Sequence, residues 1–306
     1  MAWTGICAFC GAAANDATTP IYWSRGNVDA FAQTCFAYWR CPDCEAILAR
    51  DRVDLSALYT HYPIHRGASG ASLRAFYAQI HRSRLSLLRR GGLKSQAAIY
   101  DFGEGAGDFV AFLNARGYRA VGADPFARSA PAPSRVDPPG DGGWDAFTAQ
   151  DVIEHLEQPL TLFDTAQRLL RPGGLLAIGC PDARQIRLEP PAGRAAAAHH
   201  LEAICMDMHA PFHRAMPSFA GLCRAAQAAG FAPIATRRHF PADSLWPSVN
   251  TATMIAYARA SGNRLEALYA PIDWGKVLTH TRIWGAALWG GVFRHCGHMQ
   301  VLFRKV

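Results

Sequence analysis

The chain has 306 residues, half of them apolar, and a formal net charge of +7. This length suits one large domain that carries a smaller appendage. The apolar runs are shorter than the roughly 20 residues that cross a membrane, and the first residues lack a secretion-signal pattern, so we expect a cytoplasmic protein without membrane contact. The charge permits an anionic partner, but the arginines are scattered, which disfavours nucleic acid.

Residues 1–54 are rich in cysteine, aromatic and turn residues, and we expect a small zinc-ribbon-like segment there. Two Cys-x-x-Cys pairs, Cys7 with Cys10 and Cys41 with Cys44, each place two thiolates on one tight turn. Four thiolates complete a closed, structural Zn²⁺ site. In a reducing compartment this spacing favours metal over disulfides. A redox pair and unligated core cysteines are the alternatives, with Cys35 as a substitute ligand.

Residues 55–92 change to an apolar pattern with roughly helical spacing among arginine and serine. We expect one or two helices that bridge to the next domain and cap its functional site. Gly91 and Gly92 mark their end.

Residues 93–306 alternate strand-like and helix-like patterns, which predicts a Rossmann-like α/β domain. We expect seven mostly parallel strands with helices on both faces. The expected strands are 97–102, 119–123, one near Val136, 146–149, 175–180, 232–237 and 297–305. The expected helices are 107–116, 160–170, 217–229 and several within 243–290, where Trp274, Trp284 and Trp289 are expected in the core. The weakly periodic stretch 183–215 predicts a mobile insertion over the site.

A glycine-rich turn follows the first strand, as Asp101-Phe102-Gly103-Glu104-Gly105-Ala106-Gly107, and Asp124 ends the second strand. Glycines at alternate positions let the backbone approach a ligand closely, and an acid at the tip of the second strand can accept both hydroxyls of a ribose. Glu104 inside the turn would repel a pyrophosphate but suits a ligand with an amino group and a sulfonium. The spacing also departs from the dinucleotide pattern.

Four segments resemble class I S-adenosylmethionine-dependent methyltransferases, especially the small-molecule group that includes ubiquinone and sugar methyltransferases. They are Ile99 to Gly107, Val121-Gly122-Ala123-Asp124-Pro125, Trp144 to Leu156 with its Val-Ile-Glu-His-Leu ending, and Leu169-Leu170-Arg171-Pro172-Gly173-Gly174. The resemblance covers about residues 95–240, and the order and spacing of these segments are specific.

The resemblance implies S-adenosylmethionine as cofactor and assigns residues to its parts. Asp101, Gly103 and Gly105 would line the methionine moiety, and Asp124 would bind the ribose. Pro125 and Phe126 would lie near the adenine. Asp151 and Val152, just after the fourth strand, would face the cofactor.

Three histidines are candidates for a general base. His155 follows the fourth strand, at the edge where such sheets bind ligands, and His209 and His213 flank a short turn before a helix. Methyl transfer is an in-line displacement, so a base is needed only if the acceptor is a hydroxyl, an amine or an acidic carbon. For each of the three histidines, the alternative to a role as base is a structural role, in which the ring is hydrogen-bonded within the fold.

The leading hypothesis is methyl transfer to a small biosynthetic intermediate, natural-product or sugar-like. The alternatives are an RNA methyltransferase that docks through the zinc segment, an enzyme that uses the cofactor for another reaction, and a non-catalytic binding protein. The sequence leaves the acceptor and the oligomeric state open.

Overall fold

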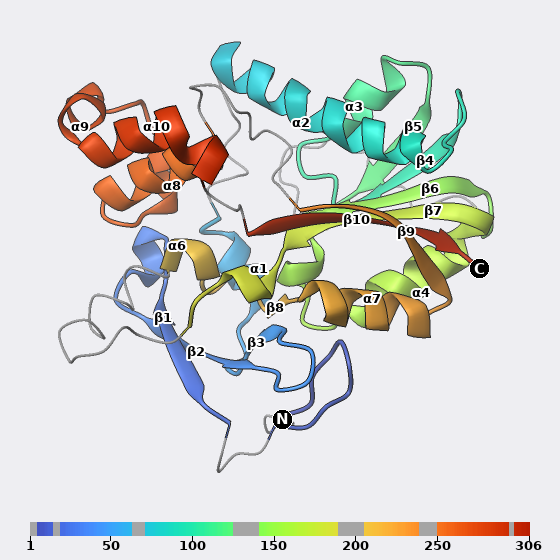
Figure 1. The fold of residues 1–306 in the computed structure, drawn as a ribbon, viewed down its shortest axis with the longest axis horizontal. Coiled ribbons are helices and arrows are strands. Elements are labelled where there is room, and N and C mark those ends of the chain that lie inside the picture. The colour runs from blue at the N-terminus through green and yellow to red at the C-terminus, as the bar shows by residue number, and fades with distance from the viewer. Residues whose placement is uncertain are drawn as a thin grey trace.

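A computed structural model of the chain describes residues 5–14, 19–62, 71–124, 141–188, 205–238, 250–293 and 297–306. Within these residues the strands form two sheets. The larger sheet has the order β5-β4-β6-β7-β10-β9, and the smaller has the order β1-β2-β3-β8 (Figure 1).

The larger sheet begins as a parallel sheet and ends as an antiparallel one. Its strands are β4 (Ala98–Phe102), β5 (Arg119–Ala123), β6 (Trp144–Gln150), β7 (Leu170–Pro181), β9 (Phe231–Arg237) and β10 (His298–Lys305). β4 pairs in parallel with β5 and β6, and β6 with β7, whereas β10 is antiparallel to both β7 and β9. The described part of the sheet therefore has six strands instead of the expected seven, because the strand expected near Val136 lies outside the described residues.

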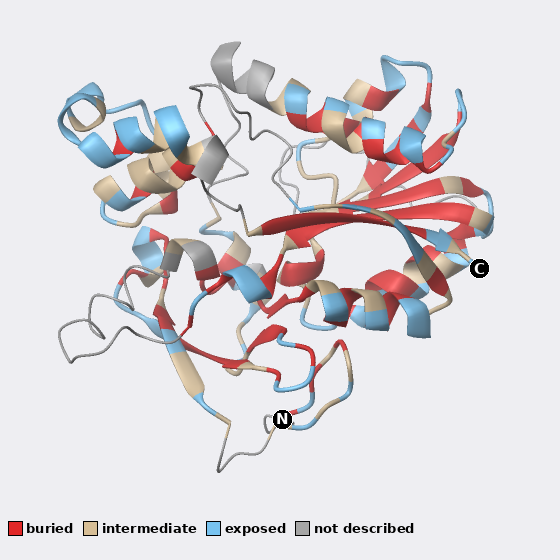
Figure 2. Cartoon of the chain, in the orientation of Figure 1, coloured by how far each residue is buried: buried red, intermediate tan, exposed pale blue. Residues whose placement is uncertain are grey.

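Helices cover both faces of this sheet, as the sequence predicts (Figure 1). α2 (Ala71–Arg90) and α3 (Asp108–Asn114) lie over one face, and α4 (Leu160–Leu169) and α7 (Phe219–Ala228) over the other. Alternate residues of β4 serve the two faces: Ile99 packs with the residues of α2 and α3, and Tyr100 with those of α4 and α7. The sheet is accordingly buried on both sides (Figure 2).

The smaller sheet combines the N-terminal segment with a strand from much later in the chain. β1 (Ile21–Arg25), β2 (Cys35–Arg40) and β3 (Ile47–Ala49) form antiparallel pairs, and β3 also pairs with β8 (Ala215–Met216). β8 comes from the stretch in which we expect a mobile insertion.

In the described parts of that stretch most apolar residues are buried, which the expectation of a mobile insertion did not include. η5 (Ala183–Gln185) and α6 (Cys205–Met208) contribute Ala183 and Met208 to a core cluster with Tyr38 and Ile47 of the small sheet. Arg40 also donates to the backbone carbonyls of Ala183 and Ile186. Apolar residues of the stretch face the N-terminal segment, and burial holds them there; residues 189–204 lie outside the described part.

The two sheets share one core at the N-terminus of α7. Cys7 and Cys44 belong to the same buried cluster as Leu222 of that helix. The Ser218 hydroxyl donates to the carbonyl of Cys44 and accepts from the amide of Gly221, so it caps the helix and joins it to the cysteine turn. The N-terminal segment is thus packed directly on the larger domain.

Residues 250–293 are mainly helical, as the sequence predicts, but their tryptophans are not where we expect them. The helices are α8 (Thr251–Ala260), η6 (Leu265–Leu268), α9 (Trp274–Thr279) and α10 (Thr281–Phe293). The expectation that the tryptophans are core residues is wrong, because Trp274, Trp284 and Trp289 are 64%, 47% and 58% exposed. The contact between α8 and α10 uses small residues: a Cβ on Gly290 would lie 2.6 Å from that of Ala252. None of the helices in the described residues is both long and apolar enough to cross a membrane.

Candidate functional site

Two glycines of the turn after β4 have different physical roles. Gly103 has a φ of +76°, and a Cβ there would lie 2.4 Å from Cγ2 of Val152, so glycine is required by the protein's own packing. Gly105 has a φ of +59°, and a Cβ there would meet no atom within 4 Å. The predicted open approach for a ligand therefore lies at Gly105, and Val152 packs on Gly103.

Asp101 and Asp124, at the ends of β4 and β5, flank this turn. The amide of Gly105 donates to Oδ2 of Asp124 at 3.1 Å, which holds the turn against the tip of β5. Asp101 is only 4% exposed, and the Thr148 hydroxyl donates to its carboxylate. Burial raises the pKa of Asp101 to about 6.

Glu104 completes an acidic group at the carboxyl end of the parallel strands. Burial, followed by the charges of Asp101 and Asp124, raises the pKa of Glu104 to about 7. Its Oε1 atom is buried and has no hydrogen-bond partner among the described residues. Three acids at one edge, two of them with raised pKa values, form a site that a cation would stabilise. Pro125 and Phe126, expected near the adenine, lie outside the described residues.

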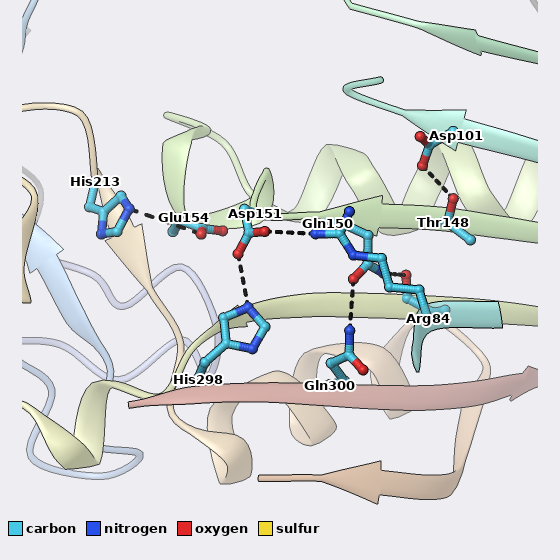
Figure 3. Close-up of polar contacts among 10 residues, drawn as sticks. Arg84, Asp101, Thr148, Gln150, Asp151, Glu154, His213, His298 and Gln300 are labelled. Carbon is cyan, nitrogen blue, oxygen red and sulfur yellow. Dashed lines mark hydrogen bonds and ion pairs between the residues drawn. The ribbon is translucent and has the colours of Figure 1, made fainter. Parts of the chain in front are cut away.

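Asp151 lies directly after β6, with a φ of +58°, and its carboxylate is held from two sides. Arg84 of α2 contacts Oδ2 at 3.0 Å, and Nε2 of His298 in β10 contacts Oδ1 at 2.8 Å (Figure 3). Although burial alone would raise it, the charge and hydrogen bond of His298, with the charge of Arg84, lower the pKa of Asp151 to about 2. Asp151 is therefore a charged anchor for α2 and β10 at the site.

The three candidate histidines lie together, although His155 is 54 residues or more from the other two. Their ring centroids are 4.9 Å apart for His155 and His213, 4.7 Å for His209 and His213, and 6.1 Å for His155 and His209. His155 ends η4 (Ile153–His155), which follows β6, and His213 comes two residues before β8. The cluster therefore lies where the small sheet meets the end of β6.

His209 has partners on both ring nitrogens. The Asn27 amide donates to Nδ1 at 2.7 Å, which places the proton on Nε2, and Nε2 donates to the Tyr62 hydroxyl at 3.1 Å. Burial lowers the pKa of His155 to about 4 and that of His209 to about 3, and lowers the pKa of His213 well below its usual value. All three rings are thus neutral at pH 7.

Aromatic side chains enclose the histidines. Tyr62 lies with its ring centroid 5.9 Å from that of His155 and 4.5 Å from that of Phe212, and Tyr59 lies 6.0 Å from Phe212. Both tyrosines belong to or follow α1 (Leu55–Tyr59), so the expected capping helix meets the histidine cluster.

Three residues of this region were missed by the sequence analysis. Glu154 is 1% exposed and lies next to His155 in the Val-Ile-Glu-His-Leu segment. Glu154 and His155 are the two titratable residues of that segment, and only His155 was chosen as a candidate. Arg84 lies on the same helix as the exposed Arg82, Arg89 and Arg90, so no sequence signal distinguishes it. His298 was detectable, because with Gln300 it places polar residues at alternate positions in the first, largely apolar part of β10.

The four predicted zinc ligands also come together. The Sγ atoms of Cys7 and Cys44 are 3.6 Å apart, and those of Cys10 and Cys41 are 3.5 Å apart. Four sulfurs at the usual zinc–sulfur bond length lie about 3.8 Å apart, so the group has the size of a tetrathiolate site. The residue after each pair, Gly11 or Glu45, has a positive φ that closes the turn. The separations also exceed a disulfide bond by more than about 1 Å.

Residues 73–236, more than half of the chain, match the model of a family described as a methyltransferase domain. The chain belongs to this family. It is an S-adenosylmethionine-dependent methyltransferase, and the match spans the glycine turn, Asp124 and the histidine cluster.

Solved methyltransferases share low similarity with this methyltransferase. A Burkholderia thailandensis 1,6-didemethyltoxoflavin-N1-methyltransferase is 15% identical, covering 87% of this chain and 97% of its own, with a TM-score of 0.45. A Mesorhizobium loti S-adenosylmethionine-dependent methyltransferase is 14% identical, covering 73% and 98%, with a TM-score of 0.43. A Streptomyces coelicolor geranyl diphosphate C-methyltransferase is 14% identical, covering 74% and 76%, with a TM-score of 0.42. The family assignment rests on the family match. None of the curated proteins matches this chain significantly.

Proposed function

We propose that this methyltransferase transfers a methyl group to a small biosynthetic intermediate that binds between the glycine turn and the histidine cluster. The observation that carries the proposal is the open space at Gly105 beside Asp124 and Glu104, at the same sheet edge as His155. In open α/β sheets, ligands bind at the carboxyl ends of the parallel strands.

The acidic group at this edge fits the charge of the cofactor. S-adenosylmethionine supplies an electrophilic methyl group on a sulfonium and carries an amino group as a second positive charge. Glu104 and Asp101 would face these charges, and Asp124 would accept the ribose hydroxyls. The raised pKa values of Glu104 and Asp101 support this assignment, because a bound cation removes the repulsion among the acids.

The enclosure of the histidine cluster favours a small acceptor over RNA. His213 is 9% exposed, and Phe212 is fully buried, so the cluster is not an exposed basic surface. An RNA site requires accessible cationic groups along a backbone. The aromatic walls of Tyr59 and Tyr62 instead suit a compact organic acceptor.

The protein's chemical contribution is to align the acceptor and to accept its proton. The Nδ1 atoms of His155 and His213 are buried and have no hydrogen-bond partner among the described residues. Both rings are neutral, so each has a lone pair with which to accept a proton. His209 donates to Tyr62 and accepts from Asn27, so it positions Tyr62 and is the weaker candidate for the base.

We also propose that Cys7, Cys10, Cys41 and Cys44 hold a structural Zn²⁺. The size of the thiolate group supports this proposal, and four protein ligands would leave no position for a substrate. Because Cys44 packs on the N-terminus of α7, the metal would stabilise the joint between the small sheet and the larger domain.

Calorimetric titration with S-adenosylhomocysteine tests the cofactor site. We expect the wild type to bind it and Asp124→Ala to weaken binding about tenfold or more, whereas Asp141→Ala, at an exposed aspartate, leaves the affinity unchanged. Absence of binding to the wild type contradicts the proposal. Mass spectrometry of candidate metabolites after incubation with S-adenosylmethionine tests the acceptor class, and strongly salt-dependent RNA binding would favour RNA instead.

A further inference from the structure

Glu154, His155 and His213 form a cluster with the chemistry and the size of a metal site. Each offers one ligand atom, and these atoms all lie within 4.8 Å of one another. Glu154 and His155 are neighbours on η4. His213, in the turn before β8, points toward Glu154 (Figure 3). Two imidazoles and one carboxylate are a ligand set that first-row divalent ions use.

The Glu154 carboxylate is only partly satisfied by the protein, through a hydrogen bond with its own backbone. It is 1% exposed; Oε2 has no hydrogen-bond partner among the described residues, and Oε1 lies 4.0 Å from Nε2 of His213, which is beyond hydrogen-bond distance. Burying an ionised carboxylate without a partner is costly. Protonation would remove the charge but would add an O–H that needs an acceptor of its own.

Each of the two imidazoles also has a buried nitrogen without a hydrogen-bond partner among the described residues. The Nδ1 atoms of His155 and His213 are both in this state. The backbone of Phe212 is a hydrogen-bond partner of the His155 ring, and Nδ1 of that ring has no partner among the described residues. In ligand histidines, a backbone carbonyl commonly holds the ring nitrogen that does not bind the metal.

The groups around the cluster favour a bound cation. Asp151 and Asp124 supply negative charge near His155, and Tyr59 and Tyr62 border it with polar aromatic rings. His209 packs on His213, but its two nitrogens are occupied by Asn27 and Tyr62. It is therefore a wall of the site and not a ligand.

We infer that Glu154, His155 and His213 bind a divalent first-row transition-metal ion, distinct from the zinc at the four cysteines. With bonds of about 2.1 Å, ligand atoms lie roughly 3.4 Å apart, so closing the site requires shifts of about 1 Å. Three protein ligands leave open positions for an oxygen of the acceptor, and a metal there lowers the pKa of a bound hydroxyl, whose proton then leaves to solvent water. In this metal-bound form His155 and His213 act as ligands and no longer as the base. Only this role for the acceptor rests on the proposed function; metal binding itself does not.

Manganese binding to the full chain tests the inference. Mn²⁺ prefers nitrogen and oxygen ligands to thiolates. The chain is therefore loaded with one equivalent of zinc, which fills the four cysteines, and is then titrated with Mn²⁺ while free Mn²⁺ is followed by electron paramagnetic resonance. We expect one equivalent to bind, and Glu154→Gln and His213→Ala each to weaken binding by about tenfold or more. His280→Ala, at an exposed histidine, is the matched control.

Two further measurements keep the result interpretable. Circular dichroism and S-adenosylhomocysteine affinity check that each variant folds. Elemental analysis of the zinc-saturated wild type needs no variant and should give two zinc ions per chain. A single zinc with no Mn²⁺ binding, or equal Mn²⁺ affinity in all variants, overturns the inference. Because cofactor and acceptor are absent from the metal titrations, that failure would leave the proposed methyl transfer standing.

Discussion

Nε2 of His298 lies 2.8 Å from the carboxylate of Asp151, so the last strand of the chain fixes the acid that ends β6. Arg84 of α2 contacts the other carboxylate oxygen at 3.0 Å. Three elements that are distant in sequence therefore meet at one charged group beside the proposed acceptor site. This contact has a measurable effect on stability.

We expect Asp151→Asn to lower the free energy of unfolding by about 1 kcal/mol at pH 7. The pKa of Asp151, about 2 in the fold, is below the usual 3.8, so its interactions stabilise the folded protein fully above about pH 4. Stabilisation is lost as the pH falls from about 4 to about 2. Solvent screens the pair because the side chain is 41% exposed, which limits the effect.

Urea denaturation across this pH range measures the difference. Asp141→Asn is the control. It removes a surface ion pair between Asp141, whose side chain is 69% exposed, and Arg168, and it should change stability far less. A loss of stability in Asp151→Asn that is the same at about pH 2 and pH 7 would contradict the assignment of this pair.

Gly103→Ala and Gly105→Ala should separate folding from cofactor binding. Gly103→Ala should destabilise the protein by about 3 kcal/mol, because the new Cβ meets Val152 and the residue has a left-handed conformation. Gly105→Ala should cost only about 1 kcal/mol, since its surroundings are open. It should nevertheless weaken S-adenosylhomocysteine binding about tenfold, because the added methyl group occupies the proposed ligand approach.

The double variant Gly103→Ala with Val152→Ala is the control for the clash. It should recover part of the stability lost in Gly103→Ala, as measured by chemical denaturation. Unchanged affinity in Gly105→Ala would place the cofactor away from this turn.

Glu104→Gln should change stability and cofactor binding in opposite directions. The raised pKa of Glu104, about 7 compared with 4.5, means that ionisation opposes folding as the pH rises through this range. Without cofactor, the variant should therefore be more stable than the wild type at about pH 8 and equal to it at about pH 4.5. With S-adenosylmethionine the order should reverse, because the carboxylate then faces a cation.

Calorimetry and thermal unfolding at these pH values test this prediction. Wild-type affinity should rise from about pH 5.5 to about pH 8 as Glu104 ionises, and the variant should show a flatter profile. Identical profiles for the two proteins would mean that Glu104 does not face the charged part of the cofactor.

Removing the proposed structural zinc should destabilise the whole protein and not only the N-terminal segment. Cys44→Ser should lower the melting temperature by about 10 °C or more, because Cys44 belongs to the core shared with Leu222 and α7. Cys35→Ser, at an exposed cysteine outside the group, should have no comparable effect. Elemental analysis should show that Cys44→Ser loses one zinc ion and that Cys35→Ser retains it.

The order of the main elements could be read from the sequence. Short apolar runs and glycine-ended helical patterns predicted β4, α3, β5, β6, α4 and β9 nearly at their observed bounds. These patterns are local, because burial of a strand on both faces and the helical period leave signals within a few residues. The glycine turn, Asp124 and the two cysteine pairs were recognisable for the same reason.

Only the tertiary structure decided what these residues contact. Local spacing does not show that Val152 packs on Gly103 while Gly105 remains open. It also does not show that apolar residues such as Ala183, Met208 and Met216 are buried on the N-terminal segment. Local spacing also missed Glu154 as a site residue and placed the tryptophans of α9 and α10 in the core. Contacts such as Asp151 with His298 join positions 147 residues apart. They depend on how whole elements pack, and that is decided by the summed burial of the chain and not by any local pattern.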